Sequence, residues 1–394
     1  MNYQEMLKEA RQNLNGSCKV CKACNGVACS GEVPGMGGKG TGSAFTENFK
    51  SLQNVKINMR VIHNVLNPDT SVELFGKKMK APIFAAPVTG TTLNMGGKIS
   101  EREYITSVVE GCIESDIYPM VGDTAVDSFL MDNLDVLKEN DGEGIVFIKP
   151  WENHDIIKKI KLAEEAGAYA VGVDVDACGL VTLSMHGKKV VPKDVEALKE
   201  LKASTKLPFI VKGIMTVDDA LLAVQAGADA IVVSNHGGRV LDCTPGSADV
   251  LPAIAEAVKG KITILADGGV RNGVDVLKMI GLGADGVLIG RPFVTASFGG
   301  GKEGVEMYVN KVIDENIEFN NEELARKIAS VYEVDLYKVV TKAPLKENVV
   351  ESLVVVGDNV VVDVHKCCDN LMNVIDNRLP KQAKQSEKVS LAEA

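Results

Sequence analysis

The unit from which the fold is built is visible in the stretch Ala226-Gly227-Ala228-Asp229-Ala230-Ile231-Val232-Val233-Ser234-Asn235-His236-Gly237-Gly238-Arg239. Its start is typical of a helix end, where glycine supplies the left-handed C-cap that turns the chain toward the next strand. The β-branched apolar run Ala230–Val233 then predicts a buried parallel strand. Similar helix ends, Ala166-Gly167-Ala168 and Leu282-Gly283-Ala284, precede other apolar runs at spacings near 60 residues. The unit is therefore repeated along the chain.

Eight short apolar runs of this kind lie between residues 82 and 289, and each precedes a helical pattern. Strands that alternate with helices predict a parallel sheet with both faces covered. Eight of them favour a closed (β/α)8 TIM barrel, an α/β fold, over the alternative of an open sheet. The predicted strands are Pro82–Ala86, Ile117–Val121, Gly144–Ile148, Ala170–Val173, Pro208–Val211, Ala230–Val233, Ile262–Leu265 and Gly286–Ile289.

We expect four regions along the chain. Residues 1–79 hold an amphipathic helix, a cysteine cluster and a glycine-rich segment, and residues 80–300 form the barrel. Residues 301–378 are a divergent C-terminal α+β extension, with a helical pattern over 302–331 and a hairpin over 353–363. The polar tail 379–394 is expected to be disordered.

The composition limits the partners and the compartment. A net charge of −10 argues against nucleic acid or an anionic membrane as a partner, since both require basic patches. No apolar run approaches the length of about 18 residues that a membrane span needs. The start Met1–Glu5 lacks the pattern of a signal peptide. We therefore expect a cytoplasmic protein.

Two glycine–arginine loops follow the last two predicted strands, at the end of the barrel where active sites lie. They read Asp267-Gly268-Gly269-Val270-Arg271 and Gly290-Arg291-Pro292. Exposed glycine amides beside guanidinium groups predict a site for a phosphate dianion. The alternative is a pair of tight turns with solvated arginines.

Four other polar residues follow strands at the same end. His236 and Arg239 suit a proton acceptor beside an anion clamp, and Asp176 is placed to hold that histidine in one tautomer. For Asp176 the alternative is a helix N-cap. Lys212 ends a buried strand, where its ammonium needs an electron-rich partner or, alternatively, a nearby carboxylate. Together the groups indicate removal of a proton from a substrate hydroxyl while hydride passes to a planar phosphate-bearing cofactor.

Three stretches closely resemble the FMN-dependent α-hydroxy acid oxidase/dehydrogenase family, which includes lactate oxidase and glycolate oxidase. They are Ser234–Asp242, Leu265–Val276 and Gly283–Phe293, and the likeness extends over about residues 40–300. The resemblance implies oxidation of a small, lactate-like L-2-hydroxy acid to the 2-oxo acid. It also implies a homo-oligomer, a tetramer or octamer, with oxygen or a redox protein as the electron acceptor.

The same resemblance assigns roles to single residues. It implies that His236 is the base, Asp176 its charge partner and Arg239 the ligand of the substrate carboxylate. It places Lys212 at the pyrimidine side of the flavin. The other implied FMN contacts are Ala86, Pro87, Val88, Ser234, Asp267, Gly269, Arg271, Gly290 and Arg291.

The chain departs from this family at three expected carboxylate contacts. The second arginine usual after Asp176 is missing from Ala177–Leu183. The tyrosine after strand three is replaced within Lys149-Pro150-Trp151, and the N-terminal tyrosine falls in Pro34-Gly35-Met36. The candidates to replace these contacts are Lys149, His186 and Lys39.

These losses keep two other functions open. An FMN-dependent isomerase of the type 2 isopentenyl-diphosphate isomerase kind would share the barrel and the flavin. A flavin electron-transfer protein would account for the lost contacts. The intact His236, Asp176 and Lys212 favour the hydroxy acid enzyme, because a carrier needs no base.

Four of the nine cysteines form the cluster Cys18-x2-Cys21-x2-Cys24-x4-Cys29. This spacing resembles that of ligands to an iron–sulfur cluster. A zinc site and reduced thiols in a loop are the alternatives. A cluster would accept electrons from reduced FMN one at a time, which would make the enzyme a dehydrogenase.

Overall fold

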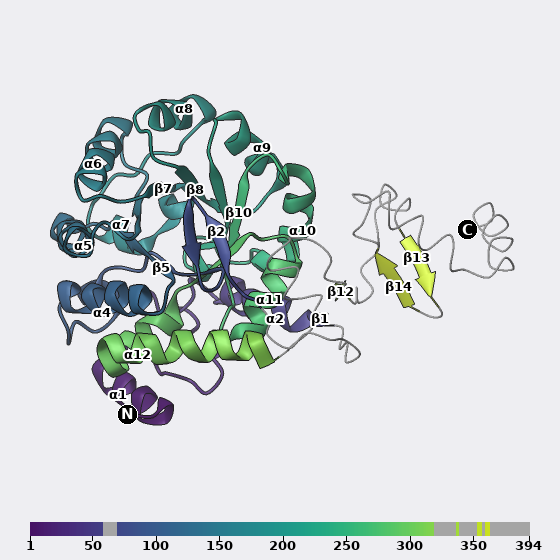
Figure 1. The fold of residues 1–394 in the computed structure, drawn as a ribbon, viewed down its shortest axis with the longest axis horizontal. Helices are drawn as coiled ribbons and strands as arrows, with labels where there is room; N and C mark the ends of the chain where they lie inside the picture. The colour runs from purple at the N-terminus through teal and green to yellow at the C-terminus, as the bar shows by residue number, and fades with distance from the viewer. Residues whose placement is uncertain (58–68, 319–335, 339–352, 357–358, 363–394) are drawn as a thin grey trace, which may run out of the picture. The chain divides into compact units, whose positions relative to one another are not determined.

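The computed structural model describes residues 1–57, 69–318, 336–338, 353–356 and 359–362 (Figure 1). The chain divides into two compact units, Met1–Leu336 and Tyr337–Ala394. Within the described residues, no helix combines the length and apolarity that crossing a bilayer requires.

The first unit is built on eight parallel strands that close into a barrel in the order β10-β11-β4-β5-β6-β7-β8-β9, which confirms the predicted (β/α)8 fold. Each predicted apolar run overlaps one strand. The largest difference is at β8, which runs three residues further than predicted, through a bulge between Lys212 and Ile214. The strands are β4 Ile83–Ala85, β5 Tyr118–Gly122, β6 Ile145–Ile148, β7 Ala170–Asp174, β8 Phe209–Ile214, β9 Ala230–Val233, β10 Thr263–Ala266 and β11 Gly286–Ile289.

Helices form a ring around the barrel (Figure 1). Gly167 and Gly227 have φ of 84° and 80°, so the predicted left-handed helix ends are confirmed. The apolar side chains of the strands are buried on both faces of the sheet, since one face lines the barrel interior and helices cover the other. The long helices of the ring are α4 Glu101–Glu114, α5 Asp127–Glu139, α6 Asn153–Glu165, α8 Val195–Ala203, α9 Val217–Gln225, α10 Ser247–Val258, α11 Gly273–Gly281 and α12 Arg291–Glu318.

Short elements interrupt the loops at the two ends of the barrel. The antiparallel pair β2 Val72–Leu74 and β3 Lys77–Met79 lies at the N-terminal ends of the strands, where Leu74 approaches Gly286. The loops at the other end contain α3 Thr91–Asn94, η2 Val175–Gly179, α7 Val181–Met185 and η3 His236–Gly238.

The N-terminal segment packs on the outside of the barrel. Helix α1, Tyr3–Asn13, lies against α12, and its capping box joins Asn2 and Glu5. Helix α2, Ser43–Asn54, was not predicted; it packs against η3 and α10, and β1 Val55–Ile57 follows it. Between α1 and α2 the only helix is the 3-10 turn η1, Val27–Cys29, and all of this stretch is described.

Few residues beyond α12 are described. Strand β12 is Leu336–Lys338, and β13 Leu353–Val356 pairs antiparallel with β14 Asn359–Val362, where a hairpin was predicted. The last part of the predicted helical stretch, 319–331, and the predicted disordered tail 379–394 lie outside the described residues.

Candidate active site

A cavity lies at the C-terminal ends of the barrel strands, and all eight strand ends contribute to its lining. Of the thirteen predicted site residues, only Asp176 and Ser234 do not line it. Met36 from the N-terminal glycine-rich segment closes one side. The eleven predicted residues that line the cavity are Ala86, Pro87, Val88, Lys212, His236, Arg239, Asp267, Gly269, Arg271, Gly290 and Arg291.

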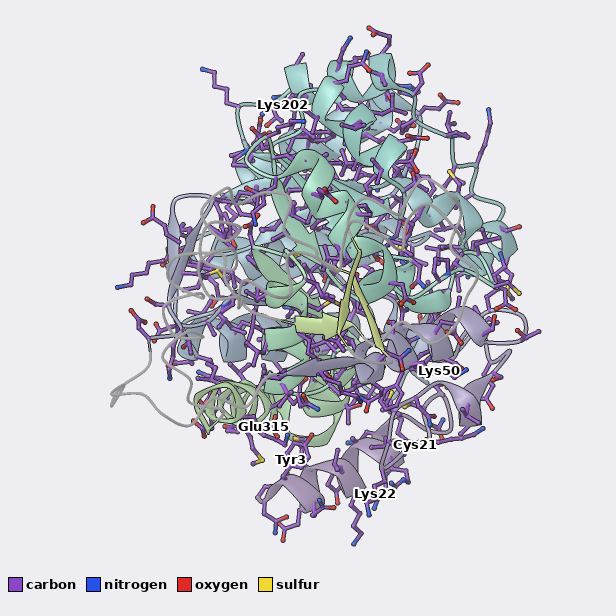
Figure 2. All side chains as sticks on the ribbon, turned by 90° about the vertical axis from the view of Figure 1, so that its right-hand side faces the viewer. Tyr3, Cys21, Lys22, Lys50, Lys202 and Glu315 are labelled. Atoms are coloured by element: carbon purple, nitrogen blue, oxygen red, sulfur yellow. The ribbon has the colours of Figure 1, made fainter. Side chains whose placement is uncertain are left out.

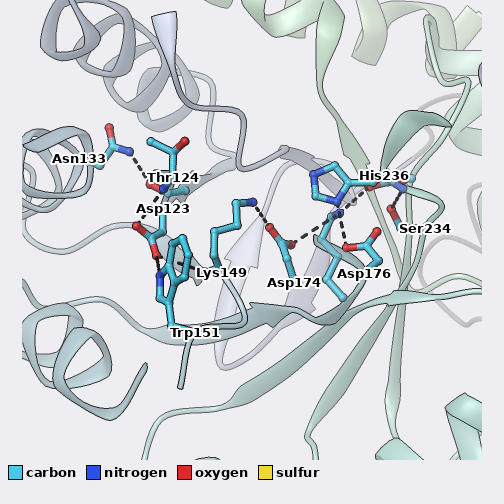
Figure 3. Close-up of polar contacts among 12 residues, drawn as sticks. Asp123, Thr124, Asn133, Lys149, Trp151, Asp174, Asp176, Ser234 and His236 are labelled. Atoms are coloured by element: carbon cyan, nitrogen blue, oxygen red, sulfur yellow. Dashed lines mark hydrogen bonds and ion pairs between the residues drawn. The ribbon is translucent and has the colours of Figure 1, made fainter. Parts of the chain in front are cut away.

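His236 is held by a carboxylate and by its own loop (Figure 3). Its Nδ1 lies 2.9 Å from Oδ1 of Asp176, so Asp176 is a partner of the histidine and not a helix cap. Its backbone has φ of 57°, a strained conformation for a residue with a side chain. The Oγ of Ser234 accepts the His236 N–H at 3.0 Å, which places Ser234 behind the histidine and not in the cavity.

The hydrogen bond at Nδ1 leaves Nε2 of His236 as the nitrogen that can accept a proton. Burial lowers the pKa of His236 below its ordinary value, while the charge of Asp176 opposes this shift. The imidazole is therefore neutral at pH 7, which is the form that a general base requires.

Buried charges line the cavity beside His236. The Nζ of Lys212 lies 3.7 Å from Asp174 Oδ1 and 3.8 Å from Asp267 Oδ2. Burial acts to lower the pKa of Lys212, but Asp174, Asp176 and Asp267 outweigh it and raise the pKa above its ordinary value. Lys212 is thus charged and paired with carboxylates, which is the second of the two predicted environments, and it also lines the cavity.

An ion pair between Lys149 and Asp174 was missed by the sequence analysis (Figure 3). Both side chains are buried, and burial of Asp174 is offset by Lys149 and Lys212, which hold its pKa well below the ordinary range. The sequence could have indicated this pair, because Lys149 directly follows β6 and Asp174 ends the neighbouring strand β7. Asp174, Asp176 and His236 also offer ligand atoms within 4.8 Å of one another, but the two ammonium groups already balance this carboxylate charge.

The other end of the cavity holds two arginines. Arg271 donates from Nε to the carbonyl of Cys24 at 3.1 Å, and its buried Nη2 has no hydrogen-bond partner. Arg291 stacks on Phe45, with 3.7 Å between the guanidinium carbon and the ring centre. The Oδ1 of Asp267 is likewise buried without a partner. An unpaired guanidinium nitrogen and an unpaired carboxylate oxygen in one cavity fit a ligand that carries a phosphate and hydroxyl groups.

The glycines before Arg271 serve the packing of α2. A Cβ on Gly269 would lie 2.2 Å from the carbonyl of Asn48, and one on Gly268 would lie 2.5 Å from Oγ of Ser247. Their φ values are 84° and 101°. The sequence analysis attributed this pair to phosphate binding, and the structure adds a steric reason for both glycines.

Arg239 is bound by the glycine-rich segment. Its Nη1 donates to the carbonyls of Gly35 at 2.6 Å and Gly37 at 3.0 Å, and its Nη2 donates to Oδ1 of Asn94 at 2.9 Å. Burial lowers the pKa of Arg239 to about 9, so the guanidinium remains charged at neutral pH. Arg291 is held in a similar way, with Nε donating to the carbonyl of Met36 at 2.7 Å.

The candidates to replace the missing carboxylate contacts lie in different places. Lys149 lines the cavity. Lys39 instead donates to the carbonyls of Gly179 and Val240, and His186 is exposed. Trp151, which stands where the family has a tyrosine, donates its indole N–H to Asp123 and does not line the cavity (Figure 3).

Comparisons with known proteins agree with this geometry. The model of the FMN-dependent dehydrogenase family matches residues 35–184 and 184–318. The chain is 32% identical over 317 residues to a peroxisomal (S)-2-hydroxyacid oxidase of Arabidopsis thaliana, an alignment that covers 71% of this chain and 82% of that protein. It is 31% identical over 297 residues to the L-lactate oxidase of Lactobacillus jensenii, covering 69% and 72%.

Solved structures show the same relationship. A mandelate oxidase with 2-hydroxy-phenylacetamide has a TM-score of 0.67 at 26% identity, covering 82% of this chain and 96% of that chain. A mandelate oxidase that holds an FMN adduct has a TM-score of 0.63 at 25% identity, covering 80% and 94%. The chain belongs to the FMN-dependent dehydrogenase family.

Proposed function

We propose that the protein oxidises a small, lactate-like L-2-hydroxy acid to the 2-oxo acid with FMN as its cofactor. The observation that carries the proposal is that His236 pairs with Asp176 and lines the cavity at the strand ends. A flavin electron carrier needs no such base, and the pair of His236 and Arg239 favours alcohol oxidation over the isomerase reaction.

The buried polar atoms that lack a protein partner in this cavity match the phosphate and the hydroxyl groups of FMN. Arg271 and Arg291 would hold the phosphate, and Asp267 Oδ1 would accept from the ribityl hydroxyls. Lys212 would place a positive charge beside the ring, with Ser234 holding the loop behind it. FMN, when bound, supplies the ring that accepts hydride from the substrate carbon. The remaining contacts would come from Ala86, Pro87, Val88, Gly269 and Gly290.

His236 and Arg239 would act directly on the substrate. Nε2 of His236 takes the hydroxyl proton, and Asp176 stabilises the imidazolium that forms. Arg239 binds the substrate carboxylate, because its guanidinium is charged and lines the cavity three residues from the base.

The proposal is tested by measuring the 2-oxo acid formed from a panel of L-2-hydroxy acids with an artificial electron acceptor. We expect turnover with at least one short L-acid and none with its D-isomer. Absence of product from every acid tested, with FMN bound at one per chain, would contradict the proposal.

We also propose a cytoplasmic homo-oligomer, a tetramer or octamer. The seven cysteines in the described residues are all free, which fits a reducing compartment. Light scattering of the purified holoprotein measures the oligomer mass, and a monomer would contradict this part.

A further inference from the structure

Four thiols that the proposed reaction does not use meet at a second cavity. Cys18, Cys21, Cys24 and Cys29 are all free and all line it. Four residues of this lining are labelled in Figure 2, namely Tyr3, Cys21, Lys22 and Glu315. This second cavity adjoins the cavity proposed for FMN, because three residues line both: Met36, Arg271 and Arg291.

The cysteine segment is fixed in position although it has almost no regular structure. Arg11 of α1 donates to the carbonyls of Lys19 at 3.1 Å and Val20 at 2.7 Å. Arg271 holds the carbonyl of Cys24 from the barrel side. Val20 has φ of 44°, unusual for a β-branched residue, and its N–H donates to Sγ of Cys18 at 3.4 Å. A long irregular segment held this way is typical of a functional loop, and a bound metal centre commonly organises one.

The spacing of the sulfurs excludes a preformed site for one metal ion. Four thiolates on one tetrahedral zinc, with Zn–S of about 2.3 Å, lie about 3.8 Å from one another. No three of these four described sulfurs lie within 4.8 Å of one another. An iron–sulfur cluster with four cysteine ligands has thiolates that bind different metal atoms, so it does not require all four sulfurs to lie this close together.

The charge around the thiols fits an anionic centre. Four thiolates gathered at one cavity carry negative charge together, so they need compensating positive charge nearby. Basic residues outnumber acidic ones in the lining, although the whole chain has a net charge of −10. The basic residues are Lys8, Arg11, Lys19, Lys22, Arg271, Arg291 and Lys311, and the acidic residues are Asp275 and Glu315.

We propose that Cys18, Cys21, Cys24 and Cys29 bind a four-iron iron–sulfur cluster, with one thiolate on each iron. The cluster is a one-electron carrier beside the flavin cavity. Oxidation of one 2-hydroxy acid to the 2-oxo acid releases two electrons and two protons. The cluster would take the electrons singly and pass each to an external one-electron acceptor protein. One proton leaves to solvent through His236, and the other, which reaches the flavin as part of the hydride, leaves from the reduced flavin as it is reoxidised. This electron-transfer role rests on the proposed function, whereas the presence of the cluster does not.

Elemental analysis of the anaerobically purified full-length protein tests the site. We expect about four iron and four acid-labile sulfide per chain, and an electron paramagnetic resonance signal after reduction with dithionite. Zinc in place of iron, or four thiols that titrate freely in a metal-free protein, would overturn the proposal.

Cys21→Ser and Cys243→Ser form a matched pair, because both cysteines are exposed. We expect Cys21→Ser to lose more than half of the iron and sulfide and Cys243→Ser to keep both. FMN content at one per chain in each variant shows that the barrel is folded. Full cluster content in Cys21→Ser, or an equal loss in Cys243→Ser, would overturn the assignment.

An anaerobic titration with the hydroxy acid substrate separates the two proposals. We expect the flavin to bleach in both variants, and the signal of the reduced cluster to appear in the wild type and Cys243→Ser only. A bleached flavin without any cluster signal in the wild type would overturn the electron-transfer role. Iron and sulfide with a flavin that no acid reduces would leave the cluster in place and contradict the proposed function.

Discussion

His236 and Arg239 lie three residues apart on one loop, but the structure holds them by different regions. The hydrogen-bond partners of His236 both come from the barrel: Asp176 after β7 and Ser234 after β9. Arg239 is held largely by the N-terminal segment, which accepts hydrogen bonds through the carbonyls of Gly35 and Gly37, while Asn94 of α3 accepts a third. In the proposed reaction the barrel would therefore position the base, while carbonyls of the N-terminal segment hold the cations proposed for the substrate and the phosphate.

The largest effect is expected from His236→Gln, which tests the barrel side of this comparison. Removing a general base lowers the rate by about 10²–10⁴-fold, so reduction of the bound flavin by substrate should slow by about this factor. The measurement is stopped-flow absorbance without oxygen. FMN content and the affinity for a 2-oxo acid should stay within about threefold of the parent. Equal reduction rates in variant and parent would show that His236 is not the general base.

Asp176→Asn should have the next largest effect, about 10²-fold on the same rate constant, because the amide cannot stabilise the imidazolium. Loss of the carboxylate also removes the charge that raises the pKa of His236. The acidic limb of the rate profile should therefore move to lower pH. A profile that keeps its position while the rate falls would mean that Asp176 only supports the loop.

Arg239→Met and Lys149→Met compare the cation held by the N-terminal segment with a cation held by the barrel. Both cations line the cavity, but Lys149 is paired with the buried Asp174. A hydrogen bond to a charged group contributes about 1.5–3 kcal/mol, so Arg239→Met should weaken binding of a 2-oxo acid by about 10–100-fold. Lys149→Met should change this dissociation constant by less than about threefold. Equilibrium titration of the flavin spectrum measures both, and the reverse order would make Lys149 the carboxylate ligand.

The smallest effect is expected from pH. Burial lowers the pKa of His236 below its ordinary value of about 6.5. The base is active when neutral, so the rate of flavin reduction should be level above about pH 6.5 and fall as pH drops through the lowered pKa. A limb above that pH would show that substrate or cofactor raises the pKa of His236.

Much of this site follows from sequence because the carboxyl ends of parallel barrel strands meet at one rim. Residues that follow strands close together on this rim, such as Asp176 after β7 and His236 after β9, can therefore be paired before their contacts are seen. The partners of Arg239 and Arg291 could not be predicted. Most of them are backbone carbonyls of residues 35–37, more than two hundred positions away, and no local pattern indicates which loop folds over the rim.

Helix α2 shows a second limit of the sequence. Its amphipathic pattern did not stand out beside the glycine-rich segment, so the packing of Asn48 against Gly269 was missed. Gly268 and Gly269 both line the cavity, but the steric reason for them was not predicted. Steric demands of this kind arise from contacts between distant segments and leave no periodic signal.

The central claim is that a 2-hydroxy acid reduces the flavin held by this barrel. The most direct measurement is the absorbance of the holoprotein without oxygen, before and after addition of each L-2-hydroxy acid in a panel. The account predicts that the flavin bands bleach with at least one short acid in the wild type and bleach far more slowly in His236→Gln. A bound flavin that no 2-hydroxy acid reduces would contradict it.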